Sequence, residues 1–202
     1  MNNKLYTLGE EICNSITHGI GSLLSIAALV LMVVVAAMHH SPMGVVTSSI
    51  FGASLTILYT MSTLYHAISN EKAKKVLKVF DHSTIYILIA GSYTPFTLVA
   101  LRSINCAKAW TIFGIVWAIA ILGIVTYAIF KNRFKILNVV SYVVMGWVIV
   151  IALPEIIQFF KVNNAINGLY LLVAGGVFYT VGVIFYALQK KNMKHKKKMK
   201  KK

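Results

Sequence analysis

The chain of 202 residues is rich in apolar side chains, at 58%, and poor in charged side chains, at 12%. A soluble domain is typically about half apolar and about a quarter charged. The composition, with a mean hydropathy of +0.75, therefore excludes most soluble folds. Because the apolar residues gather in long runs, the sequence is typical of a membrane protein.

Six apolar runs have the length of a spanning segment, which needs about 20 residues. Backbone polar groups cannot stay unpaired in lipid, and runs without alternation favour helices over a barrel. The sequence predicts an all-α fold, a polytopic transmembrane bundle of six spanning helices. We expect one bundle domain over residues 8–189 and a polybasic tail over 190–202. The runs, in chain order, are 20–38, 46–66, 83–101, 110–130, 136–153 and 167–188.

The basic residues indicate an orientation. If the amino terminus is cytoplasmic, 17 of the 20 Lys and Arg residues fall on the cytoplasmic side. Such a bias is the usual topology signal. We therefore expect a multi-pass protein of the cell (plasma) membrane with both termini cytoplasmic. Cys13 and Cys106 should lie on opposite sides of the membrane, where they cannot pair within one chain.

The net charge of +15 needs no nucleic acid to explain it, because most of it is topology signal and tail. The tail carries nine Lys residues and no aromatic residue on which a base could stack. Anionic lipid headgroups are its expected partner, at about 1 kcal/mol for each basic residue near the surface. A solvated flank that binds nothing is an equal alternative.

Polar residues gather at the predicted cytoplasmic ends of the first helices. Glu11, Asn14 and His18 have spacings that place them on one helix face. Ser62 and His66, four residues apart, share a face near the end of the second helix. Ionisable residues at membrane depth are costly and are functional candidates.

The third helix is expected to open with Asp81 and His82, at the same depth. Each polar residue also has a purely structural interpretation. Asp81 could cap its helix, Ser62 could bond to the carbonyl of residue 58, and the histidines could lie in the interface. The convergence of three helices favours a functional cluster. Neutral imidazole and carboxylate suit zinc, whose catalytic sites use three protein ligands and an open position.

Several stretches resemble the hemolysin III family, the bacterial branch of the progestin and adiponectin receptor superfamily. The resemblance covers residues 8–191 and includes S-x-x-x-H at 62–66, D-H-x-x-I-Y at 81–86 and G-x-Y-T-P at 91–95. The stretches that carry it are 10–30, 51–68, 78–101, 145–155 and 172–191.

The resemblance implies seven helices and a Zn²⁺ site near the cytoplasmic face. The resemblance implies that His66 is a zinc ligand and that Asp81 holds a zinc-bound water. It also implies that Ser62 lies beside Asp81. The family's H-x-x-x-H motif on a seventh helix is absent here, where His195 is the one histidine after Leu188. We therefore expect weak or no zinc binding. His18 or His82 as replacements for the missing ligands are an alternative. We also expect the chain to be a truncated product of a seven-helix ancestor; a genuine six-helix variant is the alternative.

Three functions follow as hypotheses. The first is a zinc-dependent membrane hydrolase of lipid amide-type bonds, with Ser62 and Asp81 as catalytic residues. The second is a non-enzymatic membrane-homeostasis or receptor-like protein. The third is a cytolytic, pore-forming protein.

Overall fold

The computed structural model describes residues 6–130 and 135–199, and describes no side chain at positions 135, 184 and 186–199. Every regular element in this part of the chain is a helix, and six helical segments are long and apolar enough to cross a membrane. This confirms the predicted all-α fold of six spanning helices. The segments are Leu8–Met38, Pro42–Ala67, Glu71–Ile104, Cys106–Phe130, Ile136–Val162 and Ile166–Val183.

The chain divides into two compact units, Met1–Ala152 and Leu153–Lys202. The predicted single bundle over 8–189 stays a prediction. The predicted tail at 190–202 lies outside the described side chains, as do Lys131, Arg133 and Lys135. The second unit holds α7 (Leu153–Val162) and α8 (Ile166–Met199), which contact each other. Their contact includes Phe160, whose ring lies against the backbone of Gly168.

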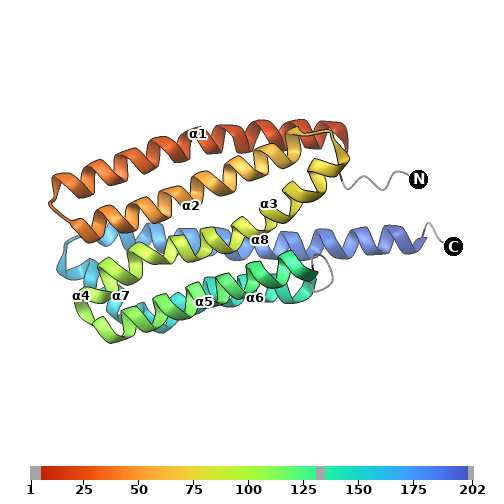
Figure 1. Ribbon diagram of the computed structural model, residues 1–202. Coiled ribbons are helices and arrows are strands. Elements are labelled where there is room, and N and C mark those ends of the chain that lie inside the picture. The colour runs from red at the N-terminus through yellow and green to blue at the C-terminus, as the bar shows by residue number, and fades with distance from the viewer. Residues whose placement is uncertain (1–5, 131–134, 200–202) are drawn as a thin grey trace. The chain divides into compact units, whose positions relative to one another are not determined.

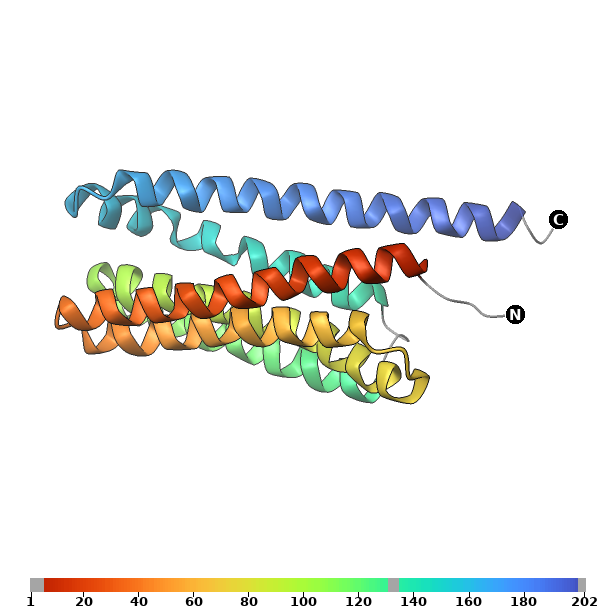
Figure 2. The ribbon, with the colours of Figure 1, turned by 90° about the horizontal axis from the view of Figure 1, so that it is seen from above.

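The first unit is built around α3 (Glu71–Pro95), the most buried of the long helices in the described part of the chain. On one side α3 packs against α2 (Pro42–Ala67), which in turn packs against α1 (Leu8–Met38). On the other side α3 packs against α5 (Cys106–Phe130). Figure 1 and Figure 2 show α1 and α2 running side by side.

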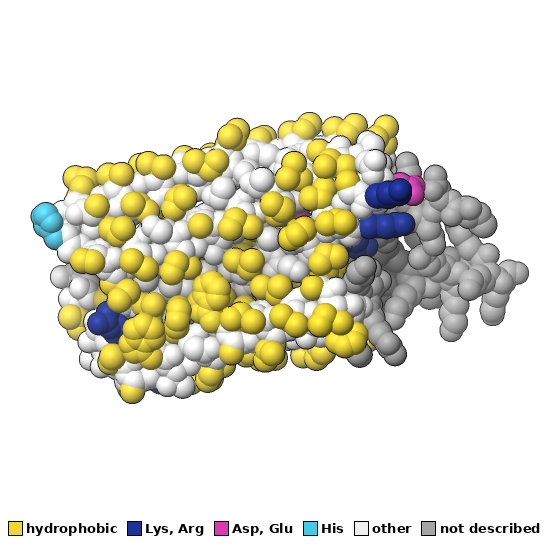
Figure 3. All heavy atoms as spheres, in the orientation of Figure 1, with side chains coloured by type: hydrophobic (Ala, Val, Ile, Leu, Met, Phe, Trp, Pro, Cys, Tyr) yellow, Lys and Arg dark blue, Asp and Glu magenta, His cyan; other side chains and the backbone are white. Residues whose placement is uncertain are grey.

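The outer face of α1 is apolar and exposed, with Leu23, Leu24 and Leu31 at 65–70% exposure. Such a face suits lipid, since lipid tails need no polar partner. Figure 3 shows hydrophobic side chains over the visible flank, while Lys and Arg side chains lie toward its ends. The inner face of α1 is held to α2 by hydroxyl pairs, Ser22 with Thr60 at 2.8 Å and Ser25 with Thr56 at 3.1 Å. Hydrogen bonds of this kind join helices where the hydrophobic effect cannot.

Two small residues allow α2 to approach its neighbours closely. A Cβ atom at Gly52 would lie 2.7 Å from the Cβ of Leu29 on α1, and one at Gly91 on α3 would lie 2.7 Å from the Cβ of Ser54. Small residues commonly mark close approaches between membrane helices. These contacts fix how α1, α2 and α3 line up along their lengths.

The first helices begin earlier than their apolar runs. Thr7 caps α1 in a capping box with Glu10, and Asn70 caps α3 by accepting hydrogen bonds from the backbone of Lys72 and Ala73. The expectation that Asp81 and His82 open the third helix is therefore wrong. The charged segment from Glu71 is helical because Lys, Glu, Ala and Leu are strong helix formers.

Two helices are interrupted at prolines. The π-helix η1 (Phe96–Leu101) follows Pro95 and leads into α4 (Arg102–Ile104). Likewise α6 (Lys135–Trp147) passes into the 3-10 helix η3 (Val148–Ala152) just before Pro154. Proline removes the N–H that a continuous helix would use. At the second break the Tyr93 hydroxyl donates to the carbonyl of Gly146 and accepts from the N–H of Ile149, both at 2.9 Å.

Candidate functional site

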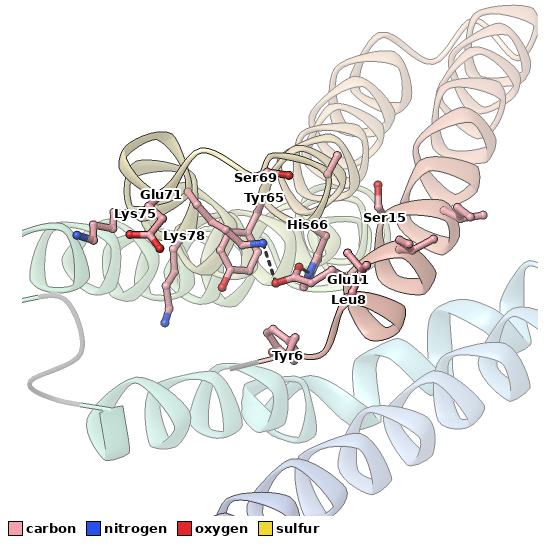
Figure 4. A pocket seen from close by; sticks show the side chains of 14 residues that line it. Tyr6, Leu8, Glu11, Ser15, Tyr65, His66, Ser69, Glu71, Lys75 and Lys78 are labelled. Atoms are coloured by element: carbon pink, nitrogen blue, oxygen red, sulfur yellow. Dashed lines mark hydrogen bonds and ion pairs between the residues drawn. The ribbon is translucent and has the colours of Figure 1, made fainter. Parts of the chain in front are cut away.

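One carboxylate joins the first three helices. The Oε2 atom of Glu11, on α1, lies 2.6 Å from Nδ1 of His66, on α2. Its other oxygen, Oε1, accepts a hydrogen bond of 2.7 Å from Nζ of Lys74, on α3. Figure 4 shows Glu11 between the ends of these helices. We call Glu11, His66 and Lys74 the three-helix junction.

Local structure brings the three residues of this junction together. Thr7 fixes the start of α1 one turn before Glu11. His66 lies in the last turn of α2, and only residues 68–70 separate α2 from α3. Lys74 lies in the first turns of α3, and its backbone N–H bonds to the carbonyl of Asn70. The short connection therefore returns a basic side chain to the end of the bundle where Glu11 begins.

His66 is enclosed by other rings. Its side chain is 7% exposed. The ring of Tyr65 lies 4.8 Å away and that of Tyr6 5.4 Å away, both edge-on. The ring of His18 stacks parallel to it at 6.0 Å. Because Nδ1 is held by the carboxylate of Glu11, a neutral His66 has its available lone pair on Nε2.

Ser62 and Asp81 form a second polar contact, next to the junction. The buried Ser62 lies close to Asp81, so a polar pair spans α2 and α3. Asp81 is 17% exposed and is close enough to act electrostatically on both His66 and His18. The interpretation of Asp81 as a helix cap is wrong, because Asn70 is the cap and Asp81 lies inside α3.

The other two predicted members of the cluster have different surroundings. His82 turns toward α5, where its ring stacks on Tyr127 at 5.2 Å. Its Nδ1 lies 3.3 Å from Oδ2 of Asp81 without the alignment of a hydrogen bond. Asn14 is half-buried, and its backbone carbonyl accepts a bond from Thr17.

The structure thus brings together Glu11, His18, Ser62, His66 and Asp81, whose metal and catalytic roles stay predictions. A catalytic zinc site needs three protein ligands. Among the residues with described side chains, no group of three His, Cys, Asp or Glu is arranged to hold a metal. His66 has one nitrogen to offer, since its other nitrogen is held by Glu11. The donors that the structure describes therefore do not fit a resident zinc ion.

A cavity of about 740 Å³ opens beside the three-helix junction. Its walls come from the start of α1, the end of α2 and the first turns of α3 (Figure 4). The residues that line it are Tyr6, Leu8, Glu11, Ile12, Ser15, Ile16, Tyr65, His66, Ala67, Ser69, Glu71, Lys74, Lys75 and Lys78. We call it the junction cavity.

Sequence reasoning missed the part of Lys74, Tyr65 and Tyr6 in this site. Lys74 was counted only as a topology signal, because the third helix was expected to begin near Asp81. The signal that could have placed it is Asn70 followed by strong helix formers, which marks a helix start. A helix from residue 71 would have put Lys74 beside the end of the second helix.

The comparisons with known proteins agree with the motifs. The model of the family described as Haemolysin-III related matches residues 6–199. Over 186 residues, the chain is 41% identical to "Hemolysin-3" of Bacillus cereus, covering 92% of this chain and 82% of that protein. It is 45% identical to "Hemolysin-3 homolog" of Bacillus subtilis (strain 168), covering 92% and 84%.

A more distant relative is "Monocyte to macrophage differentiation factor" of Homo sapiens, 27% identical over 70% of this chain and 57% of that protein. No solved structure matches the chain. With a family model that matches nearly the whole chain, six helices of spanning character and two bacterial relatives above 40% identity, the chain belongs to the haemolysin-III-related family of multi-pass membrane proteins.

Proposed function

We propose that this chain binds a membrane lipid in the junction cavity and acts as a non-enzymatic, receptor-like protein of membrane homeostasis. The observation that carries the proposal is the composition of the cavity wall. One side is apolar and comes from Leu8, Ile12 and Ile16 of α1, and the other side is charged and comes from the three-helix junction and the start of α3. A ligand that fits both sides has an apolar chain and a polar head.

The apolar side is a stripe along α1. Leu8, Ile12 and Ile16 are spaced four residues apart and are 51–77% exposed. Residues at this spacing share one helix face, so an acyl chain along them would stay in apolar surroundings. Farther along α1, exposed Leu23 and Leu24 would meet the lipid tails of the bilayer.

The charged side is the three-helix junction together with the basic start of α3. A cavity of about 740 Å³ lies within the range of about 300–1,000 Å³ that is usual for small-molecule sites. That volume suits a headgroup and the first part of its chains. Lys74 pairs with Glu11 at 2.7 Å. A headgroup that bound Lys74 would therefore weaken this link between α1 and α3. This competition is how lipid binding would change the protein.

Lipid retention by the purified protein tests the proposal. The variant Ile12→Trp places a bulky ring in the apolar wall, while Leu24→Trp puts the same ring on the exposed face of α1 outside the cavity. Native mass spectrometry would count the lipids that each variant keeps. We expect Ile12→Trp to lose most of the retained lipid and Leu24→Trp to keep it. Equal retention in both variants would contradict lipid binding in the junction cavity.

Hydrolysis of a lipid amide-type bond is the second candidate. The observation in its favour is the closeness of Ser62 to Asp81, beside His66, whose Nδ1 is held by the carboxylate of Glu11. In metal sites, a carboxylate commonly holds the second nitrogen of a metal-ligating histidine in this way. The described donors, however, do not complete a metal site. Zinc content and product release from lipid amides, each measured in the unchanged chain and in Asp81→Asn, would test hydrolysis. Stoichiometric zinc and turnover, both lost in that variant, would favour hydrolysis over the receptor-like role.

Cytolysis is a third candidate, and its support is the name of the Bacillus relatives. Release of a dye from liposomes that contain the purified chain would measure it. Dye release above that of empty liposomes would support a cytolytic action.

We further propose that the protein lies in the plasma membrane with both termini cytoplasmic, which places the junction cavity at the cytoplasmic face. The support is the distribution of basic residues, 17 of 20 on one predicted side. The lysine-rich tail would then meet anionic headgroups of the same leaflet.

A further inference from the structure

We propose that the ligand of the junction cavity is an anionic phospholipid, whose phosphate is bound by Lys75 and Lys78. This inference rests on the lipid-binding function proposed above. It goes further in naming the class of lipid and the residues that select it.

The balance of charge in the cavity wall favours an anion. Glu11 is one acidic residue of the wall, and its charge is already met by Lys74 at 2.7 Å. Glu71 is the other acidic residue of the wall. The wall also contains two further basic residues, Lys75 and Lys78, which outnumber Glu71. The wall therefore carries net positive charge before any ligand binds.

The spacing of the basic residues suits a phosphate group. Lys75 and Lys78 are three residues apart on α3, so their side chains leave neighbouring positions of the same helix face. Figure 4 shows Lys78 extending beside the cavity and Lys75 at its far edge. A phosphate has several acceptor oxygens and can take a charge-assisted hydrogen bond from more than one ammonium group.

The apolar wall favours a lipid as the source of the phosphate. Leu8, Ile12 and Ile16 line the cavity from α1, whereas the lysines line it from α3, and all three apolar side chains are exposed. Free phosphate would leave this apolar stripe uncovered. A phospholipid covers both walls at once, with its phosphate at α3 and an acyl chain along α1.

A substitution at Lys72 distinguishes a role of the α3 lysines in lipid binding from a role in membrane topology. It lies on the same helix as Lys75 and Lys78 and contributes equally to the positive-inside bias, but it does not line the cavity. If the lysines of α3 served topology alone, replacing Lys72 would have the same effect on lipid binding as replacing Lys75 or Lys78. Lys72→Gln is therefore the matched control.

The experiment compares phosphatidylglycerol with phosphatidylcholine. The full chain is reconstituted in phosphatidylcholine nanodiscs that contain a trace of one photoactivatable lipid or the other, and the cross-linked fraction is measured. Both lipids carry a phosphate, but the choline of phosphatidylcholine offsets its charge. We therefore expect the anionic probe to cross-link more, by about fivefold for each lysine that meets its uncompensated charge. The pair Lys75→Gln with Lys78→Gln should reduce it to the level of the zwitterionic probe, while Lys72→Gln should keep the preference.

Two further arms separate the explanations. The double variant Lys75→Arg with Lys78→Arg should keep the preference, and thermal unfolding of each variant shows whether it is folded. Inorganic phosphate, compared with chloride at equal ionic strength, should not displace the phospholipid; displacement would identify a site for the free anion and overturn the inference.

The remaining outcomes distinguish the two proposals. If both probes label the cavity equally and Ile12→Trp removes the labelling, the lipid-binding function stands and the anionic preference fails. A preference lost equally in Lys72→Gln would also overturn the inference. If neither probe labels the cavity, the proposed function itself fails.

Discussion

At Glu11 a single side chain meets partners from two other helices. Its two oxygens lie 2.6 Å from His66 and 2.7 Å from Lys74. Hydrogen bonds to charged groups contribute about 1.5–3 kcal/mol each, more than neutral ones. Lys74 also lies over the ring of Tyr65, at 5.3 Å from its centre. Removing the charge of Glu11 therefore affects all three helices.

We predict that Glu11→Gln lowers the free energy of unfolding by about 1–3 kcal/mol, because an amide cannot hold both an ammonium and an imidazole as a carboxylate does. Thermal unfolding of the purified protein in detergent would measure the effect. Glu10→Gln is the control, since Gln keeps the capping box with Thr7; its cost should stay below about 1 kcal/mol. Equal losses in both variants would contradict the role given to Glu11.

Part of the site was predictable from spacing. Glu11 and His18 share a face of α1, Ser62 and His66 share a face of α2, and the structure brings these faces together. Spacing could not show which partner each residue takes. That His66 pairs with Glu11 while Asp81 lies beside Ser62 depends on how far α1 and α3 are shifted along α2, and packing decides this.

Among the elements, α3 determines how the first unit is arranged. It is the most buried long helix in the described part, and its first turns carry the lysines of the junction cavity. The apolar run at 83–101 was enough to predict its spanning part. The charged turns before it were not recognised as helix, because hydropathy finds the lipid-facing length of a helix and not its end.

We predict that Gly91→Ala destabilises the protein by about 1–3 kcal/mol, because its new methyl group would overlap the side chain of Ser54 on α2. Thermal unfolding would measure this as well. Gly114→Ala is the control, since a Cβ there meets nothing within 4 Å; it should be neutral or slightly stabilising.

The same contact allows a rescue experiment. Ser54→Gly removes both atoms that the new methyl group would meet first. Combined with Gly91→Ala it should restore part of the lost stability, which a double-mutant cycle would show as a coupling energy. Additive effects of the two substitutions would contradict close packing of α2 and α3 at this point.

For the whole molecule, composition and six apolar runs were sufficient to predict the class and the number of spanning helices. The interruptions at Pro95 and before Pro154, and the division into two units, were not predicted. The reason is physical. Hydropathy reports transfer into lipid, whereas a break depends on which neighbour, such as Tyr93, satisfies the freed backbone groups.

The two cysteines offer a test of the proposed topology without fusion partners. Both are exposed, Cys13 in the second turn of α1 and Cys106 at the start of α5. A membrane-impermeant maleimide added to intact cells should label Cys106, and label Cys13 only after permeabilisation. Cys106→Ser should abolish labelling in intact cells. Labelling of Cys13 from outside would reverse the orientation.

The most direct test of the central claim, lipid binding in the junction cavity, is to map where a bound lipid cross-links. A photoactivatable phospholipid is added to the full chain in nanodiscs, and labelled peptides are identified by mass spectrometry. We predict labels concentrated on residues 8–16 and 65–78, which hold most of the cavity wall, and lost in Ile12→Trp. Labels spread evenly along the exposed face of α1, unchanged in that variant, would contradict the account.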